Sequence, residues 1–331
     1  MKIRLAMLLF ALCGAVSAET LSVMSKPELR SFLDEMVSRH NFQRTDLAAL
    51  FSQAALRPDI IEAISRPAEA KPWYEYRDIF LTRGRIEAGV EFWDEHAVDL
   101  ARAEKTYGVP AEIIVAIIGV ETRYGKNTGS YRVLDALATL AFDYPPRSDF
   151  FRKELEQYLL LTREEKIPPL SLTGSYAGAM GLPQFIPSSF RSYAVDFDGD
   201  GRRDLWSNAS DAIGSVAHYF NEHGWQAGKA VASRAEVSGE RYPSLLENDL
   251  KPALSMAQLR EQGVRASDPV PMDALGSLLQ FETESGMEYW VGLQNFYVIT
   301  RYNHSALYAM AVYQLSQQIS AKRQLRVTSD K

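Results

Sequence analysis

The sequence predicts a mainly α protein, of the α+β class, with one small β-containing lobe. Apolar residues recur at three- and four-residue spacing through most of the chain, as expected for amphipathic helices. Proline and glycine mark the ends of several of these segments, and short alternating runs gather between residues 227 and 303. The chain has 331 residues, of which 46% are hydrophobic and 24% charged, so it can bury a large core.

Helices are expected in six stretches of the chain. The third stretch is the most apolar, with Pro110 in its first turn and Gly125 just beyond its end, the usual arrangement at helix termini. The six stretches are residues 26–64, 90–107, 109–123, 147–163, 211–223 and 305–322.

Three short runs of alternating apolar and polar residues predict strands. They are SLLQFE at residues 277–282, EYWVGL at 288–293 and FYVITRY at 296–302. Because proline, glycine and charged residues interrupt the helical pattern around them, we expect a small β lobe inserted before the C-terminal helix.

The first 18 residues have the layout of a secretory signal, which predicts export. A basic start with Lys2 and Arg4 precedes an apolar stretch too short to span a bilayer, and small residues end at Ala18. The alternative is a lipoprotein anchored through Cys13, although Leu12 fits poorly before a lipid-bearing cysteine. Cleavage after Ala18 would leave no cysteine, so stability would depend on core burial alone.

The charge of the chain argues against nucleic acid as a partner. The formal net charge is −6, and loss of Lys2 and Arg4 with the signal would make it more negative by two. Basic residues are scattered, so an anionic membrane surface is not indicated, and no later segment predicts a transmembrane anchor.

Glu121 is the first candidate catalytic residue, in the segment VPAEIIVAIIGVETRYG at residues 109–125. On a helix it shares a face with Ile118, Ile117 and Ile114. Such apolar neighbours disfavour the ionised form and raise the pKa of a carboxyl group, as a general acid requires. The alternative is a simple ion pair between Glu121 and Arg123 or a neighbouring basic group at the helix end.

A second motif is GSYAGAMGLPQF at residues 174–185, in which small residues flank Ser175 and Gln184. Small side chains allow a ligand or a backbone to approach closely, so this loop could line a cleft. The alternative is a tight loop that packs against another element.

Aromatic and amide side chains provide a third group of candidates. Sugars present apolar faces and hydroxyl edges, which suit tyrosine rings and amide groups. Each tyrosine taken alone could equally be a core or rim residue. The candidates are Tyr76, Tyr219, Tyr302, Asn303 and Tyr308.

The segment DFDGDGRRD at residues 196–204 has the spacing of a calcium-binding loop, with Gly201 where the chain turns sharply. Ser207 occupies the position of the usual bidentate glutamate, so the last ligand must come from elsewhere, and Asp211 is the nearest acid. The alternative is a solvated acidic turn. The acids at positions 1, 3, 5 and 9 of the loop are Asp196, Asp198, Asp200 and Asp204.

Four motifs together resemble the B-type lytic murein transglycosylases, in the same order and between residues 76 and 315. They are GVETRYG, GSYAGAMGLPQF, YAVDFDGDG with DAIGSVAHYF, and NFYVITRYNHS. The resemblance implies a lysozyme-like core flanked by an α-helical lobe and a small β lobe. It also implies cleavage of the bond between N-acetylmuramic acid and N-acetylglucosamine without water, which leaves 1,6-anhydromuramic acid ends.

The resemblance assigns the catalytic acid to Glu121 and cleft-lining polar roles to Ser175, Gln184 and Asn303. The four tyrosines above match residues that contact sugar. One extra residue between Trp206 and the last acid leaves the final calcium ligand open. In the family this metal is structural, so no catalytic cofactor is expected. The calcium set would be Asp196, Asp198, Asp200, the Arg202 carbonyl and Asp211.

Most glycoside hydrolases use two carboxyl groups. Only one acid of this chain lies in a convincing site, which agrees with a reaction that does not use water. The substrate's acetamido group and 6-hydroxyl would replace the second carboxylate and the water. Two alternatives stay open: a muramidase that uses water, and a non-catalytic peptidoglycan-binding protein.

The expected chain is a periplasmic monomer that acts on peptidoglycan strands, and other cell-wall enzymes are candidate partners. Lipid anchoring to the outer membrane is the alternative. We expect five segments. They are a signal peptide at 1–18, a helical lobe at 19–75 with part of the following helices, a catalytic core at 76–226 with an EF-hand-like loop at 196–211, a β lobe at 227–300, and a closing C-terminal helix at 301–331.

Overall fold

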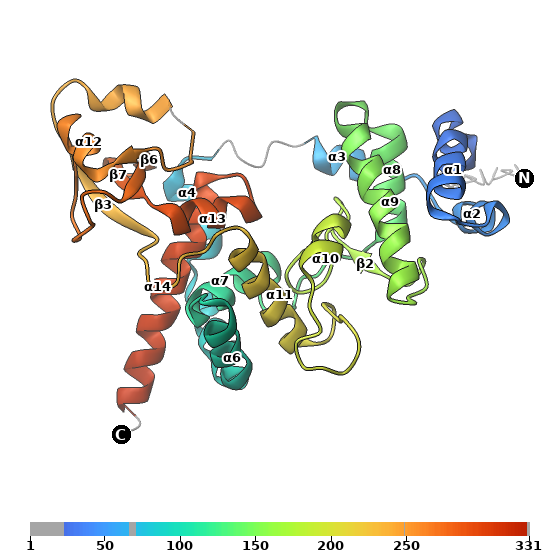
Figure 1. The fold of residues 1–331 in the computed structure, drawn as a ribbon, viewed down its shortest axis with the longest axis horizontal. Helices are drawn as coiled ribbons and strands as arrows, with labels where there is room; N and C mark the ends of the chain where they lie inside the picture. Colours follow the sequence, from blue (N-terminus) through green and yellow to red (C-terminus); the bar gives the residue numbers. More distant parts are fainter. Residues whose placement is uncertain (1–22, 66–70, 248, 330–331) are drawn as a thin grey trace, which may run out of the picture.

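The computed structural model describes residues 23–65, 71–247 and 249–329. This part of the chain is mainly helical, as the sequence predicts, with a small five-stranded sheet and a separate two-stranded one (Figure 1). The expected signal peptide and Cys13 lie outside the described residues. Within the described ranges, no helix combines the length and apolar character needed to cross a membrane.

Helices fill the six expected stretches, and several stretches hold more than one helix. The first is divided because Asn41, with φ 57°, ends α1 in the left-handed conformation and Pro58 begins α3. Helices α4, α8, α10, α12 and α13 lie outside those stretches. The helices are α1 (Pro27–His40), α2 (Arg44–Phe51), α3 (Pro58–Ile64), α4 (Trp73–Phe80), α5 (Arg83–Glu95), α6 (Ala97–Tyr107), α7 (Ala111–Thr122), α8 (Val133–Asp143), α9 (Ser148–Glu164), α10 (Pro187–Tyr193), α11 (Ala209–Glu222), α12 (Met256–Glu261), α13 (Gln294–Tyr302) and α14 (Ala306–Ser329).

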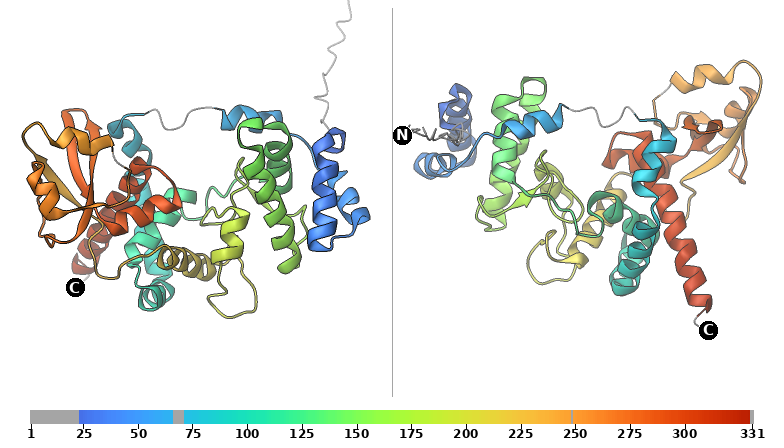
Figure 2. Two further views of the ribbon diagram at one scale, coloured as in Figure 1. Left: turned by 45° about the horizontal axis from the view of Figure 1, so that its top comes forward. Right: turned by 180° about the vertical axis from the view of Figure 1, so that it is seen from behind.

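Helices α1, α2, α3, α8 and α9 lie together at one end of the molecule (Figures 1 and 2). Helix α8 is buried from Val133 to Phe142 and packs on α9. This end of the molecule is therefore built from two stretches of chain that are separated by α4 to α7.

Helix α7 lies at the centre of the other helices. It contacts α5, α6, α11 and α14, and every residue from Ile113 to Val120 is buried. A helix that is apolar on all sides must be surrounded by protein, which explains why this segment lacks a polar face.

The opposite end of the molecule holds a five-stranded antiparallel sheet in the order β4-β6-β7-β3-β5 (Figure 1). A separate small cluster packs beneath it, formed by Leu245, Met256, Leu259, Val264, Leu278, Val291 and Leu293. Two further short strands, β1 (Tyr131–Arg132) and β2 (Thr173–Gly174), pair elsewhere in the chain. The strands of the larger sheet are β3 (Ala232–Val237), β4 (Leu254–Ser255), β5 (Val264–Ala266), β6 (Leu275–Thr283) and β7 (Gly286–Gly292).

Two of the three predicted strands are present as β6 and β7, but the third prediction is wrong. The run FYVITRY at 296–302 is part of α13. Its β-branched residues favour a strand locally, yet Asn295, Val298 and Ile299 are buried at helical spacing and α13 packs on α14. Tertiary packing therefore overrides the local preference.

Candidate active site

Glu121 lies in the last turn of α7 and is half-buried. The hydroxyl of Tyr308, in the first turn of α14, donates a hydrogen bond to its Oε1 atom. These residues are 187 positions apart in the sequence, and the packing of α14 on α7 brings them together. Two of the predicted site residues are thus in direct contact.

The surroundings of Glu121 favour its protonated form. Burial raises its pKa to about 7, and the hydrogen bond from Tyr308 opposes this by lowering it. The alternative interpretation, an ion pair with Arg123, is wrong. Arg123 is exposed and ends the helix in the left-handed conformation, and Glu121 forms no salt bridge with a basic residue of the described ranges.

The chain folds back sharply after Glu121. Arg123 and Tyr124 both have positive φ, at 51° and 60°, and the Tyr124 hydroxyl donates to the Arg85 carbonyl of α5 at 3.0 Å. A Cβ atom at Gly119 would overlap that tyrosine ring, so only glycine fits there. Sequence reasoning missed these residues, although a glycine within an aliphatic helix was a signal for close packing.

Two of the predicted tyrosines, Tyr302 and Tyr308, lie close enough to Glu121 to interact with its carboxyl group. Burial, and then the charge of Glu121, raise the pKa values of Tyr302 and Tyr308. Tyr76 acts electrostatically on Tyr308, and its ring stacks on Trp73 with centroids 6.4 Å apart. Three of the four predicted tyrosines are therefore neighbours of the acid or of one another.

Tyr219 belongs to the same aromatic group but lies one ring further from Glu121. Its ring centroid is 4.9 Å from that of Tyr302, and its hydroxyl donates to the Arg301 carbonyl at 2.6 Å. The Tyr302 hydroxyl donates to the Pro183 carbonyl at 2.6 Å. These two hydroxyl groups anchor backbone segments.

The loop at 174–185 packs beside the end of α7. The Thr122 hydroxyl donates to the Leu182 carbonyl at 2.9 Å, directly after Glu121. Ser175 Oγ accepts from the Ala179 amide at 3.0 Å. Both interpretations of this loop are therefore compatible with the structure, because it is tightly folded and also adjoins the acid.

Gln184 and Asn303 complete the predicted polar set. Gln184 has φ 51° and its Nε2 atom donates to the Thr128 carbonyl at 3.1 Å, whereas Asn303 is exposed at the end of α13, next to Tyr302. Within the described residues, neither side chain, nor that of Ser175, is hydrogen-bonded to Glu121. They lie on segments adjoining the acid rather than in contact with it.

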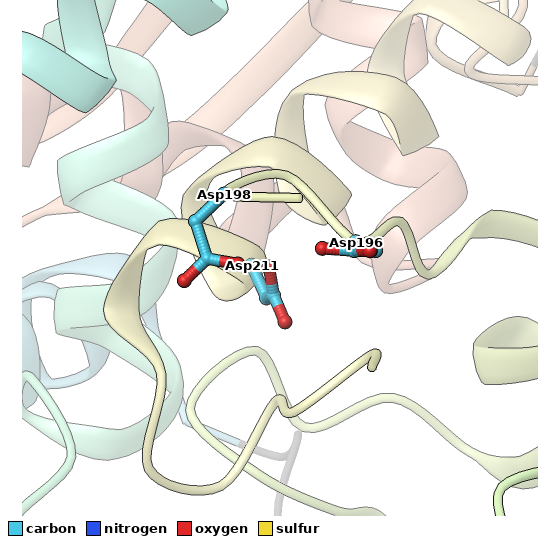
Figure 3. A group of neighbouring side chains, drawn as sticks. All are labelled: Asp196, Asp198 and Asp211. Atoms are coloured by element: carbon cyan, nitrogen blue, oxygen red, sulfur yellow. The ribbon is translucent and has the colours of Figure 1, made fainter. Parts of the chain in front are cut away.

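The predicted calcium loop brings three acids together. Oxygen atoms of Asp196, Asp198 and Asp211 lie within 4.8 Å of one another, two of them from the loop and one from the first turn of α11 (Figure 3). Carboxylate oxygens are the ligands that calcium prefers. Asp200 is not in this group, because its Oδ1 accepts from the Arg202 amide at 2.9 Å.

Asp211 is held in place by the loop that it joins. Its two carboxyl oxygens accept from the amides of Phe197 at 2.7 Å and Asp204 at 2.8 Å. Asn208, which sequence reasoning missed, caps α11 and donates to Asp198 at 2.7 Å. The extra residue before Asp211 is thus accommodated without displacing that carboxylate from the group.

The fold and the site together define a lysozyme-like protein that presents one protonatable glutamate at the end of a buried helix. The chain belongs to the transglycosylase SLT domain family, whose model matches residues 24–317.

Several known proteins resemble most of the chain. It is 45% identical over 309 residues to membrane-bound lytic murein transglycosylase B of Escherichia coli K12, covering 90% of this chain and 84% of the relative. Soluble lytic transglycosylase SltB1 of Pseudomonas aeruginosa is 57% identical with a TM-score of 0.86, over 90% of this chain and 100% of that one. The Escherichia coli lytic transglycosylase Slt35, solved in complex with calcium, is 46% identical with a TM-score of 0.84, over 90% and 94% of the two chains.

Proposed function

We propose that this protein is a peptidoglycan lytic transglycosylase that cleaves the β-1,4 bond between N-acetylmuramic acid and N-acetylglucosamine and leaves 1,6-anhydromuramic acid ends. One observation carries the proposal: Glu121 is a half-buried carboxyl group whose pKa is raised to about 7 and which accepts a hydrogen bond from Tyr308. Membership of the transglycosylase family supports the same chemistry.

Glu121 acts first as an acid and then as a base. Its proton passes to the glycosidic oxygen as the bond from the muramyl C1 atom breaks, so N-acetylglucosamine leaves as the alcohol. The carboxylate then takes the proton of the muramyl 6-hydroxyl as that oxygen bonds to C1. No water is consumed, and Glu121 regains its proton. Because its pKa is near neutrality, both forms are accessible in one catalytic cycle.

The remaining predicted residues bind and orient the sugar. Ser175 and Asn303 would orient the acetamido group, whose oxygen supports the anomeric centre, and Gln184 would act near Glu121. Their segments adjoin the acid, and tyrosine rings supply apolar surface for sugar rings.

We propose that calcium is a structural ion held by the carboxylates of Asp196, Asp198 and Asp211 and by the Arg202 carbonyl. Asp200 would join these ligands if its side chain turned away from the Arg202 amide. Bound there, the ion would neutralise clustered acids and fix the loop to α11. It takes no part in proton transfer.

We further propose that residues 1–18 direct export to the periplasm, and that the mature monomer begins at Glu19 and acts on glycan strands. The division into a helical lobe, a catalytic core at 76–226, a β lobe at 227–300 and a closing helix at 301–331 is also a proposal. Determination of the mature N-terminus distinguishes cleavage before Glu19 from lipidation at Cys13.

The mass of the products tests the reaction. Purified peptidoglycan is digested with the wild-type protein and with Glu121→Gln, and soluble fragments are weighed by mass spectrometry. Anhydromuramyl products from the wild type alone support the proposal. Products heavier by one water would identify a muramidase, and the absence of wild-type products would leave a peptidoglycan-binding protein.

A further inference from the structure

A histidine at the end of α11 stacks on the tyrosine group. The ring of His223 lies on that of Tyr219, with centroids 4.0 Å apart and an angle of 19° between planes. Four more rings meet Tyr219, those of Tyr193 at 4.8 Å, Tyr302 at 4.9 Å, Phe185 at 5.7 Å and Phe220 at 6.0 Å. Tyr219 is only 7% exposed, whereas His223 is half-buried.

This packing changes what Tyr219 can offer to a sugar. Its hydroxyl already donates to the Arg301 carbonyl, and neighbouring rings enclose its own ring. The imidazole of His223 covers one face of the Tyr219 ring, so a ligand that approached from that face would contact the imidazole rather than the phenol. The ring of Tyr193 also contacts the imidazole, with centroids 5.1 Å apart. Tyr219 then supports the contact surface rather than forming it.

The nitrogen atoms of His223 have distinct roles. Its Nδ1 atom lies 2.7 Å from the Tyr219 carbonyl oxygen, which can only accept, so Nδ1 carries the hydrogen. Burial lowers the pKa of His223, and the hydrogen bond to the Tyr219 carbonyl opposes this by raising it. The charge of Arg301 then lowers the pKa, and that of Glu222 raises it. In the neutral ring, Nε2 is therefore an acceptor.

A short chain of contacts joins His223 to the acid. Tyr219 touches Tyr302, whose hydroxyl binds the Pro183 carbonyl. The adjacent Leu182 carbonyl accepts from Thr122, which follows Glu121 in α7. Tyr219 and Tyr302 thus connect His223 to the loop at 182–183, which is hydrogen-bonded to the end of α7.

We propose that His223 is a substrate-binding residue that contacts the glycan strand, with its outer ring face against the apolar face of a sugar and its Nε2 atom accepting from a hydroxyl or acetamido N–H group. The inference rests on the proposed function and adds to it. Tyr219 has a positioning role, because its ring and its carbonyl fix the plane and the tautomer of the imidazole.

Three substitutions separate the ring from the acceptor. His223→Phe keeps a ring that can stack on Tyr219 but has no nitrogen atoms. His223→Gln keeps an acceptor at about the reach of Nε2 but has no ring. His223→Ala removes both. Loss of one hydrogen bond predicts a three- to tenfold rise in KM for polymeric glycan, with kcat within about twofold of wild type.

His218 provides a matched control on the same helix. Its Nδ1 atom bonds to the Tyr193 carbonyl at 3.0 Å, and its Nε2 atom already lies 3.6 Å from Glu222. His218→Phe should leave KM unchanged. The order of KM expected is wild type and His218→Phe lowest, then His223→Phe and His223→Gln, then His223→Ala.

Melting temperatures establish whether each variant is folded. If His223→Ala is unfolded, the KM values of His223→Phe and His223→Gln decide the test. A wild-type KM in both, or a fall in kcat alone, overturns the inference. A second measurement uses Glu121→Gln protein and cosedimentation with intact peptidoglycan, where adding His223→Phe should weaken binding three- to tenfold. Failure of the wild type to cleave peptidoglycan would overturn the proposed function instead, so the two failures differ.

Discussion

Glu121 and the acidic loop at 196–211 both depend on carboxyl groups, but their surroundings differ in kind. Glu121 stands alone at the end of an apolar helix, and its partner Tyr308 comes from 187 residues away. Asp196, Asp198 and Asp211 come from one short segment, where two of them are exposed and backbone amides donate to their oxygens. A dry environment raises the pKa of a single acid, whereas several carboxylate oxygens gathered in one place suit a cation.

Replacement of Glu121 should therefore have the largest effect on turnover. Replacement by glutamine keeps the shape of the side chain and removes the proton that is transferred. We expect kcat on purified peptidoglycan to fall by about 10²- to 10⁴-fold, measured by release of soluble fragments. Asp198→Asn is the comparison, because it changes a carboxyl group outside the site and should retain wild-type kcat when it is folded. Near-normal turnover by Glu121→Gln would contradict the proposed chemistry.

Removal of calcium should lower the stability of the fold, whereas Glu121→Gln lowers kcat. At a free calcium concentration one hundred times the dissociation constant, binding would stabilise the fold by about 2.7 kcal/mol, and chelation would remove this. Scanning calorimetry with and without chelator should show a lower melting temperature for wild type and Glu121→Gln alike.

Asp198→Asn should respond much less to the chelator, because one of the three gathered carboxylates is lost. If wild-type protein melts at the same temperature with calcium and with chelator, the loop is a solvated turn.

The contrast between the two regions also explains what the sequence could predict. The loop is local, and its spacing indicated Asp196, Asp198, Asp200 and Asp204. Asp196 and Asp198 do come together, with Asp211, which was expected as the nearest acid to supply a last ligand, whereas Asp200 is not in the group. The apolar helix before Glu121 was equally legible, because burial on every side leaves a continuous aliphatic run. Both predictions used residues that are close in sequence.

Other features depend on contacts that no local pattern contains. The motif resemblance named Tyr308 as a sugar contact, but its hydrogen bond to Glu121 arises from the packing of α14 on α7. The strand predicted at 296–302 is helical because α13 packs on α14. His223 lies four residues after Tyr219 on the helix expected at 211–223, so their contact follows from helical spacing. The other rings around Tyr219, such as those of Tyr302 and Phe185, come from distant segments.

Gly119 tests how tightly the end of the catalytic helix is held. Gly119→Ala would place a methyl group into the Tyr124 ring, which is fixed by its bond to the Arg85 carbonyl. We expect destabilisation by about 1–3 kcal/mol in urea unfolding. Gly84→Ala is the control, because no neighbouring atom lies within 4 Å of its added Cβ, and it should be neutral or stabilising by about 0.4–1 kcal/mol. Equal effects of the two substitutions would show that Tyr124 moves freely aside.

The smallest expected effect is a shift of the pH profile in Tyr308→Phe. Glu121 must be protonated in the free enzyme to donate, so kcat/KM should decline as pH rises through its pKa of about 7. The hydrogen bond from Tyr308 stabilises the carboxylate and lowers that pKa, so its loss should raise it and move the decline to higher pH. A net hydrogen-bond contribution of about 0.5–1.5 kcal/mol limits the shift to about one pH unit. Movement of the decline to lower pH would mean that Tyr308 favours the protonated form of Glu121. Hydrogen-bond donors could then not explain why Glu121 differs from the acids of the loop.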